Sequence, residues 1–175
     1  MVTLTATENK MPRWLSEGIS VYEERERDPG WGQWMNSTYR TWILEGELTP
    51  VSRLSEAFLR PKSPAHLDFA YYESSLVVEY LIETKDLDSV LKLLDDLATG
   101  LSMKEGLTRY WGDPEFIDED FERYAKDKAE KYGSDWDWQP LPEQGQDLSL
   151  LELEKLAGQQ ANSVSLQFSL AAALI

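Results

Sequence analysis

Residues 12–24 read Pro-Arg-Trp-Leu-Ser-Glu-Gly-Ile-Ser-Val-Tyr-Glu-Glu, and their spacing predicts an amphipathic helix. Trp14, Gly18 and Val21 recur at intervals of three and four residues, which places them on one helix face. Residues 28–32, Asp-Pro-Gly-Trp-Gly, are turn formers that end the helix. The segment is therefore a short helix with one face prepared for close packing.

The same helical period recurs along most of the chain. Its strongest example covers residues 65–84, where apolar side chains form a wide stripe. Further helices are predicted over residues 33–44, 52–59, 87–98, 102–111, 113–131, 147–158 and 163–175. Alternation typical of a strand is found only at residues 2–6, so the sequence predicts an all-α fold.

Composition divides the chain into three expected parts. Residues 1–132 form a helical body, residues 133–146 are a linker or packing arm rich in Gly, Pro, Asp and Trp, and residues 147–175 form a helical hairpin. The hairpin resembles the first helix pair of a tetratricopeptide-type repeat, truncated, which needs neighbouring repeats to bury its face. A plain hairpin packed on the body is the alternative.

Charge excludes several classes of partner. The 175 residues include 32 Asp and Glu against 17 Lys and Arg, a formal charge of −15. Such a field repels nucleic-acid phosphates and anionic membrane surfaces. No apolar run is long enough to span a bilayer, and the first residues lack the pattern of a signal peptide.

Two residue counts restrict the chemistry further. Cysteine is absent and histidine occurs once, as His66. Disulfides, thiolate catalysis and Cys-ligated metals are excluded, and a site that needs two histidines cannot be built from this chain. We expect His66 to be structural, because it lies at a loop-to-helix junction without a second histidine.

The helix at residues 12–24 resembles the segment of gluzincin zinc metallopeptidases, the thermolysin-like superfamily, that follows their H-E-x-x-H helix. A bacterial branch similar to peptidase MA is closer still. The likeness extends to Val2-Thr3-Leu4, Arg27-Asp-Pro-Gly-Trp-Gly32, Gly46-Glu-Leu48, Phe58-Leu-Arg-Pro61 and Ala70–Tyr80, and it covers about residues 1–130. The resemblance implies the helical C-terminal subdomain of an enzyme that hydrolyses peptides or proteins with zinc-activated water.

The resemblance also implies roles for individual residues. Glu17 matches the third zinc ligand, and Glu24, two helical turns later, matches a carboxylate that holds the other N–H of a zinc-binding histidine. Tyr71, or Tyr72 if the register differs by one, matches a tyrosine that donates to the developing oxyanion. The plainer alternatives are an exposed helix glutamate, a solvated acidic face and two core aromatic residues.

The motif histidines and the general-base glutamate are absent from the chain, which begins where the residue after the second histidine would stand. We therefore expect the missing H-E-x-x-H half as a partner, zinc only in the complete protein and none in this chain alone, and no activity from the isolated chain. Family likeness suggests an exported or envelope-associated parent. A non-catalytic all-α interaction module is the alternative, and calcium binding by the acidic surface has only composition behind it.

The absence of that half has a packing consequence. The helix that contains Trp14 would pack on the missing zinc helix, so we expect apolar surface to be left open. The isolated chain would then form a homodimer or cover the surface with its own tail.

Overall fold

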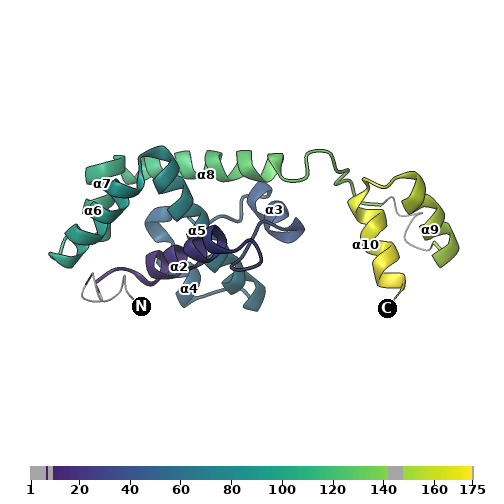
Figure 1. Cartoon of the computed structure of the whole chain (residues 1–175), viewed down its shortest axis with the longest axis horizontal. Coiled ribbons are helices and arrows are strands. Elements are labelled where there is room, and N and C mark those ends of the chain that lie inside the picture. The colour runs from purple at the N-terminus through teal and green to yellow at the C-terminus, as the bar shows by residue number, and fades with distance from the viewer. Residues whose placement is uncertain (1–6, 8–9, 142–147, 175) are drawn as a thin grey trace. The chain divides into compact units, whose positions relative to one another are not determined.

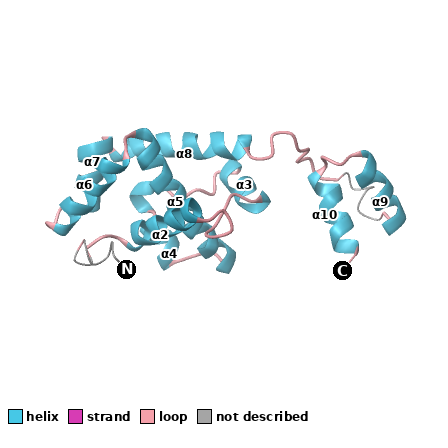
Figure 2. Ribbon diagram, in the orientation of Figure 1, coloured by secondary structure: helices cyan, strands magenta, loops and turns pink. Residues whose placement is uncertain are grey.

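The computed structural model describes residue 7 and residues 10–141 and 148–174. These residues form helices joined by loops, without a strand apart from one isolated bridge between Asp137 and Ser163 (Figure 2). The predicted all-α fold is confirmed. The tripeptide Val2-Thr3-Leu4 and the strand alternative at residues 2–6 lie outside the described residues.

The chain divides into two compact units, Met1–Glu130 and Lys131–Ile175. The first unit contains most of the helices (Figure 1). They are α2 (Arg13–Arg27), α3 (Ser37–Leu44), the 3₁₀ helix η1 (Val51–Arg53), α4 (Ser55–Leu59), α5 (Pro64–Thr84), α6 (Leu87–Ala98), α7 (Met103–Trp111) and α8 (Pro114–Lys131), whose last residue opens the second unit.

Local capping explains where several helices begin. Ser102 and Glu105 form the reciprocal capping box at the start of α7 that their spacing indicates. The expected start of α3 at residue 33 is wrong. Asn36 instead accepts a hydrogen bond from the backbone N–H of Tyr39 at 2.9 Å, so the helix begins at Ser37.

The closest helix pair of the first unit is α2 and α5, which lie side by side in Figure 1. Gly18 of α2 faces Ser74 of α5, and a Cβ atom on Gly18 would lie only 2.5 Å from the Ser74 carbonyl oxygen. Only glycine permits this approach. The Glu-Gly pair at residues 17 and 18 is thereby brought against the middle of α5.

The core of the first unit gathers around α5, whose buried side chains include Leu76, Val77 and Leu81. Trp14 joins this core with only 2% of its surface exposed. The expectation that the face around Trp14 is left open is therefore wrong for this side chain, because the other helices of the unit cover it. Homodimer formation stays a prediction.

The second unit contains α9 (Leu150–Gln159) and α10 (Val164–Ala173), which pack on each other through Leu153, Ala157 and Leu166. A capping box between Ser149 and Glu152 begins α9. Two helices in succession agree with the expected hairpin, while the likeness to a tetratricopeptide-type repeat stays a prediction.

An aromatic cluster opens the second unit ahead of α9. Tyr132, Trp136 and Trp138 have ring centroids 5.8–6.2 Å apart, and Gly133 adopts a φ of 58° beneath the two indoles. Part of the predicted linker is therefore an ordered aromatic turn.

Within the described residues, no helix combines the length and the apolar character that crossing a bilayer requires.

Candidate functional site

Glu17 and Tyr71, two of the predicted site residues, meet at one guanidinium group. The Arg13 Nε atom lies 3.4 Å from Glu17 Oε1, and Arg13 Nη2 donates a hydrogen bond to the Tyr71 hydroxyl at 2.8 Å. Arg13 and Glu17 are one turn apart on α2, while Tyr71 comes from α5, one turn before Ser74. The close approach at Gly18 therefore places this cluster.

Phe58 of α4 completes the cluster. The Arg13 guanidinium carbon lies 5.3 Å from the centre of the Phe58 ring, and the Tyr71 ring meets Phe58 edge-on at 5.2 Å. The hydrogen bond to Tyr71, with a smaller contribution from Glu17, raises the pKa of Arg13. The predictions from sequence missed Arg13 and Phe58, although the four-residue spacing of Arg13 and Glu17 is typical of a helical ion pair.

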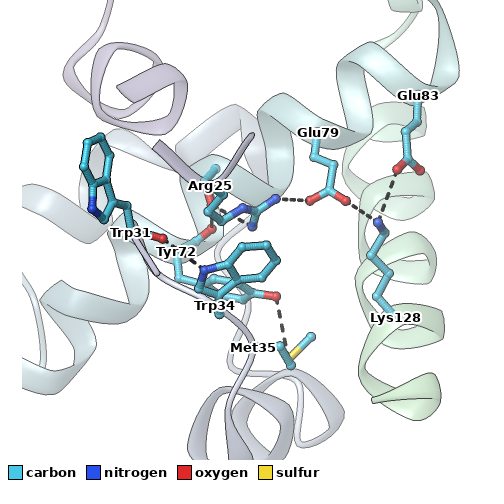
Figure 3. Close-up of polar contacts among 9 residues, drawn as sticks. Arg25, Trp31, Trp34, Met35, Tyr72, Glu79, Glu83 and Lys128 are labelled. Atoms are coloured by element: carbon cyan, nitrogen blue, oxygen red, sulfur yellow. Dashed lines mark hydrogen bonds and ion pairs between the residues drawn. The ribbon is translucent and has the colours of Figure 1, made fainter. Parts of the chain in front are cut away.

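The two candidate tyrosines lie in different surroundings. Tyr72 is 2% exposed, its ring stacks on Tyr39 with centroids 5.0 Å apart, and its hydroxyl lies 3.7 Å from the Met35 sulfur (Figure 3). Tyr71 is half-buried and turns its hydroxyl toward α2. Tyr71 therefore shares the partner Arg13 with Glu17.

Glu24 lies outside this cluster. It is exposed, two turns after Glu17, and lines a shallow hollow with Ser20, Glu23 and Trp31. Within the part of the chain that the structure describes, its carboxylate has no ion-pair partner. This is the solvated acidic face that its sequence neighbourhood also indicates.

A second ionic network lies near the other end of α2 (Figure 3). Arg25 Nη2 donates to Glu79 Oε2 at 2.5 Å, and its guanidinium lies 5.1 Å from the centre of the Trp34 ring. Lys128 forms ion pairs with both Glu79 and Glu83. Burial raises the pKa of Glu79, but hydrogen bonds from Lys128 and Arg25 outweigh it, and the pKa lies below its usual range.

His66 has contacts that account for its ring. The imidazole stacks on Trp42 with centroids 4.3 Å apart, and its Nδ1 atom lies 2.8 Å from the Ser63 hydroxyl. Ser63 also caps α5. The single histidine of the chain is thus engaged at the start of α5, in keeping with the expected structural role.

Zinc in a peptidase requires three protein ligands and one open position. Glu17 offers one accessible carboxylate, since 35% of its side chain is exposed. Across residue 7 and residues 10–141 and 148–174, no group of three or more His, Cys, Asp or Glu side chains could hold a metal ion. The described residues alone do not fit zinc, so no chemical step can be derived through the metal from them.

The Trp-Leu-Ser-Glu-Gly helix packed on α5, within an all-α unit, defines a helical domain of peptidase type. A family model described as the Peptidase MA superfamily matches residues 1–127. The chain belongs to this superfamily, which confirms the peptidase-MA-like resemblance at that level. No match was found among the curated proteins or among the solved structures.

Proposed function

We propose that this chain carries part of the active site of a gluzincin-type zinc metallopeptidase. Glu17 supplies one zinc ligand, Tyr71 supplies the donor to the oxyanion, and two histidines and a general-base glutamate come from sequence outside this chain. The observation that supports the proposal best is the meeting of Glu17 and Tyr71 at Arg13, because the two matched residues come from different helices.

The geometry suggests how the tyrosine is prepared. Arg13 donates to the hydroxyl oxygen of Tyr71, so the phenolic O–H remains able to donate to a substrate oxygen. Phe58 limits the movement of the Tyr71 ring from one side. Zinc in the complete protein would supply a water of near-neutral pKa, and the part of this chain would be to offer the Glu17 carboxylate and the Tyr71 O–H donor.

Zinc binding tests the proposal in two stages. Calorimetric titration of the isolated chain should show no tight stoichiometric binding, because one carboxylate cannot hold the metal. The genomic sequence upstream of Met1 should then encode an in-frame H-E-x-x-H, and the extended protein should bind one zinc and cleave peptides. Tight zinc binding by the isolated monomer would contradict the proposal.

Three matched substitutions in the extended protein test which carboxylates contribute to zinc binding. Glu17→Gln should lower zinc affinity by more than about 100-fold, and Glu24→Gln by about 10-fold if it orients a histidine. Glu23→Gln, on the same helix and exposed, is the control and should change nothing. Equal effects from Glu17→Gln and Glu23→Gln would remove the ligand assignment.

An all-α interaction module is the second candidate. It is favoured by exposed apolar side chains on the second unit, where Leu151 is 76% and Phe168 is 61% exposed. An upstream promoter and ribosome-binding site in place of an H-E-x-x-H segment would favour it over the peptidase.

A further inference from the structure

A cavity of about 540 Å³ lies among the loop before η1, helix α4, the loop that follows it and the first half of α5. Its most buried lining side chains are Phe69 and Glu73, 3% and 1% exposed, which form its floor. Neither Glu17 nor Tyr71 lines it. Its volume is in the range of small-molecule sites, and the peptidase proposal assigns it no role.

Glu73 is unusual because it is a buried carboxyl without a charged partner. Its Oε1 atom accepts a hydrogen bond from the backbone N–H of Thr49 at 2.5 Å, and no ion pair to it occurs among the described residues. Burial raises the pKa of Glu73 to about 8, although hydrogen bonds from Thr49 lower it. At pH 7 the carboxyl is therefore mostly protonated.

The other charged groups around the cavity largely neutralise one another. Glu47 forms an ion pair with Lys62, and Glu56 forms one with Arg53 at 2.7 Å. Arg60 lies exposed at the mouth, and His66 of α5 lines one side. Glu47, Glu56, Arg60, Lys62 and His66 are the other titratable and charged groups that line the cavity, and among the described residues none forms an ion pair with Glu73.

We propose that this cavity binds a small organic cation, an ammonium or a guanidinium group, whose charge is met by the Glu73 carboxylate and whose apolar part lies on Phe69. A buried carboxylate is stabilised when a cation pairs with it, and the Phe69 ring offers apolar surface to the rest of the ligand. The net charge of −15 favours cations over anions across the whole chain. An anion would find no opposite charge at the floor of the cavity, where the protonated Glu73 carboxyl offers a single O–H donor.

Calorimetry on the full chain tests this with n-butylammonium and methylguanidinium as probes and butyrate as the anion. At least one cation should bind saturably with millimolar affinity, and butyrate should not bind. Because the cation ionises Glu73, binding at pH 7 should release up to about one proton per site. The release is measured by repeating the titration in buffers of different ionisation enthalpy.

Two variants locate the effect. Glu73→Gln keeps the acceptor for Thr49, and it should abolish proton release and weaken cation binding at least tenfold. Glu56→Gln, at the exposed mouth, should leave affinity within about twofold. Butyrate binding as tightly as the cations, cation binding without proton release, or no cation binding would each overturn the proposal. If Glu73→Gln does not fold, the proposal is tested by whether cation binding to the unaltered chain releases protons.

Discussion

Two ionic clusters join α2 to α5, and they differ in exposure and in how their charges are paired. In the cluster of Arg13, Glu17 and Tyr71, the Arg13 and Glu17 side chains are 56% and 35% exposed. In the Arg25 network, the Arg25 and Glu79 side chains are 6% and 18% exposed. The first cluster shares one cation between a carboxylate and a phenol, whereas the second places two cations on Glu79.

This difference in burial distinguishes a structural ion pair from an accessible carboxylate on the same helix. Glu79 is committed to its partners, because breaking a buried pair leaves an uncompensated charge. Glu17 is held by one long contact in a more accessible position, so little stability opposes its binding another cation. The same residue types are therefore structural near one end of α2 and available near the other.

The largest expected effect is obtained by giving both arginines the same substitution. Arg25→Gln should lower the free energy of unfolding by about 3 kcal/mol, because Glu79 keeps only the more exposed Lys128 as a partner and the buried contacts of Arg25 with Ser75 and Trp34 are lost. Arg13→Gln should leave stability unchanged within error, because its ion pair is exposed. Urea denaturation of the two variants measures both, and equal losses would show that the clusters do not differ as proposed.

Glu73 shows the effect of burial without an ion pair, since it is at least as buried as Arg25 but has no charged partner among the described residues. Its pKa of about 8 lies above its ordinary value of 4.5, so the folded state binds more protons than the unfolded state between these pH values. The resulting stabilisation is complete below pH 4.5 and is lost as the pH rises through 8.

Between pH 5 and pH 8 the unaltered chain should therefore lose about 3 kcal/mol of stability relative to Glu73→Gln. Denaturation curves of the two proteins across this range provide the measurement. Parallel pH profiles would show that the carboxyl titrates normally.

Gly18 tests the contact that holds both clusters between α2 and α5. Gly18→Ala should destabilise by about 2 kcal/mol, because the new Cβ meets the backbone of Ser74. Gly106→Ala in α7 is the matched control. Its Cβ would lie 2.4 Å from the tip of the buried Leu93 side chain and not from backbone, and because a side-chain tip shifts more readily than backbone, the cost should be smaller. The melting temperature of Gly18→Ala should be lower than that of Gly106→Ala, and the reverse order would contradict the prediction.

The smallest effect is expected from the hydroxyl of Tyr71. Tyr71→Phe should change stability by less than about 0.5 kcal/mol, because its partner Arg13 is exposed. Tyr80→Phe removes the hydrogen bond to Asp120 from a buried ring and should cost about 1 kcal/mol. A larger loss for Tyr71→Phe would make that hydroxyl a structural group.

Much of the fold could be predicted because its signals are local. The stripe at residues 65–84, the Ser102–Glu105 capping box and the residues around Gly100, whose φ is 100°, indicate helices and their ends without tertiary information. Periodicity continues through residues 33–36 and does not reveal the start of α3, because the cap depends on the conformation of Asn36.

The candidate site was predictable only in part. Residue patterns matched Glu17 and both tyrosines to a family, and superfamily membership is confirmed, but their roles stay proposals. Tyr71 and Tyr72 are adjacent in sequence and equally aromatic, so only the rotation of α5 against α2 shows which hydroxyl reaches Arg13. Glu73 had no local signal either, since its burial depends on the loop at Thr49.

The sequence by itself determined that the chain is helical, roughly where most helices lie, and the limits on chemistry, since one histidine and no cysteine need no coordinates to interpret. Tertiary structure alone decided which charges are paired, which carboxyl is buried and which tyrosine hydroxyl bonds to Arg13. The physical reason is that hydrogen bonding within a helix connects residues close in sequence, whereas desolvation and ion pairing depend on side chains brought together from distant segments.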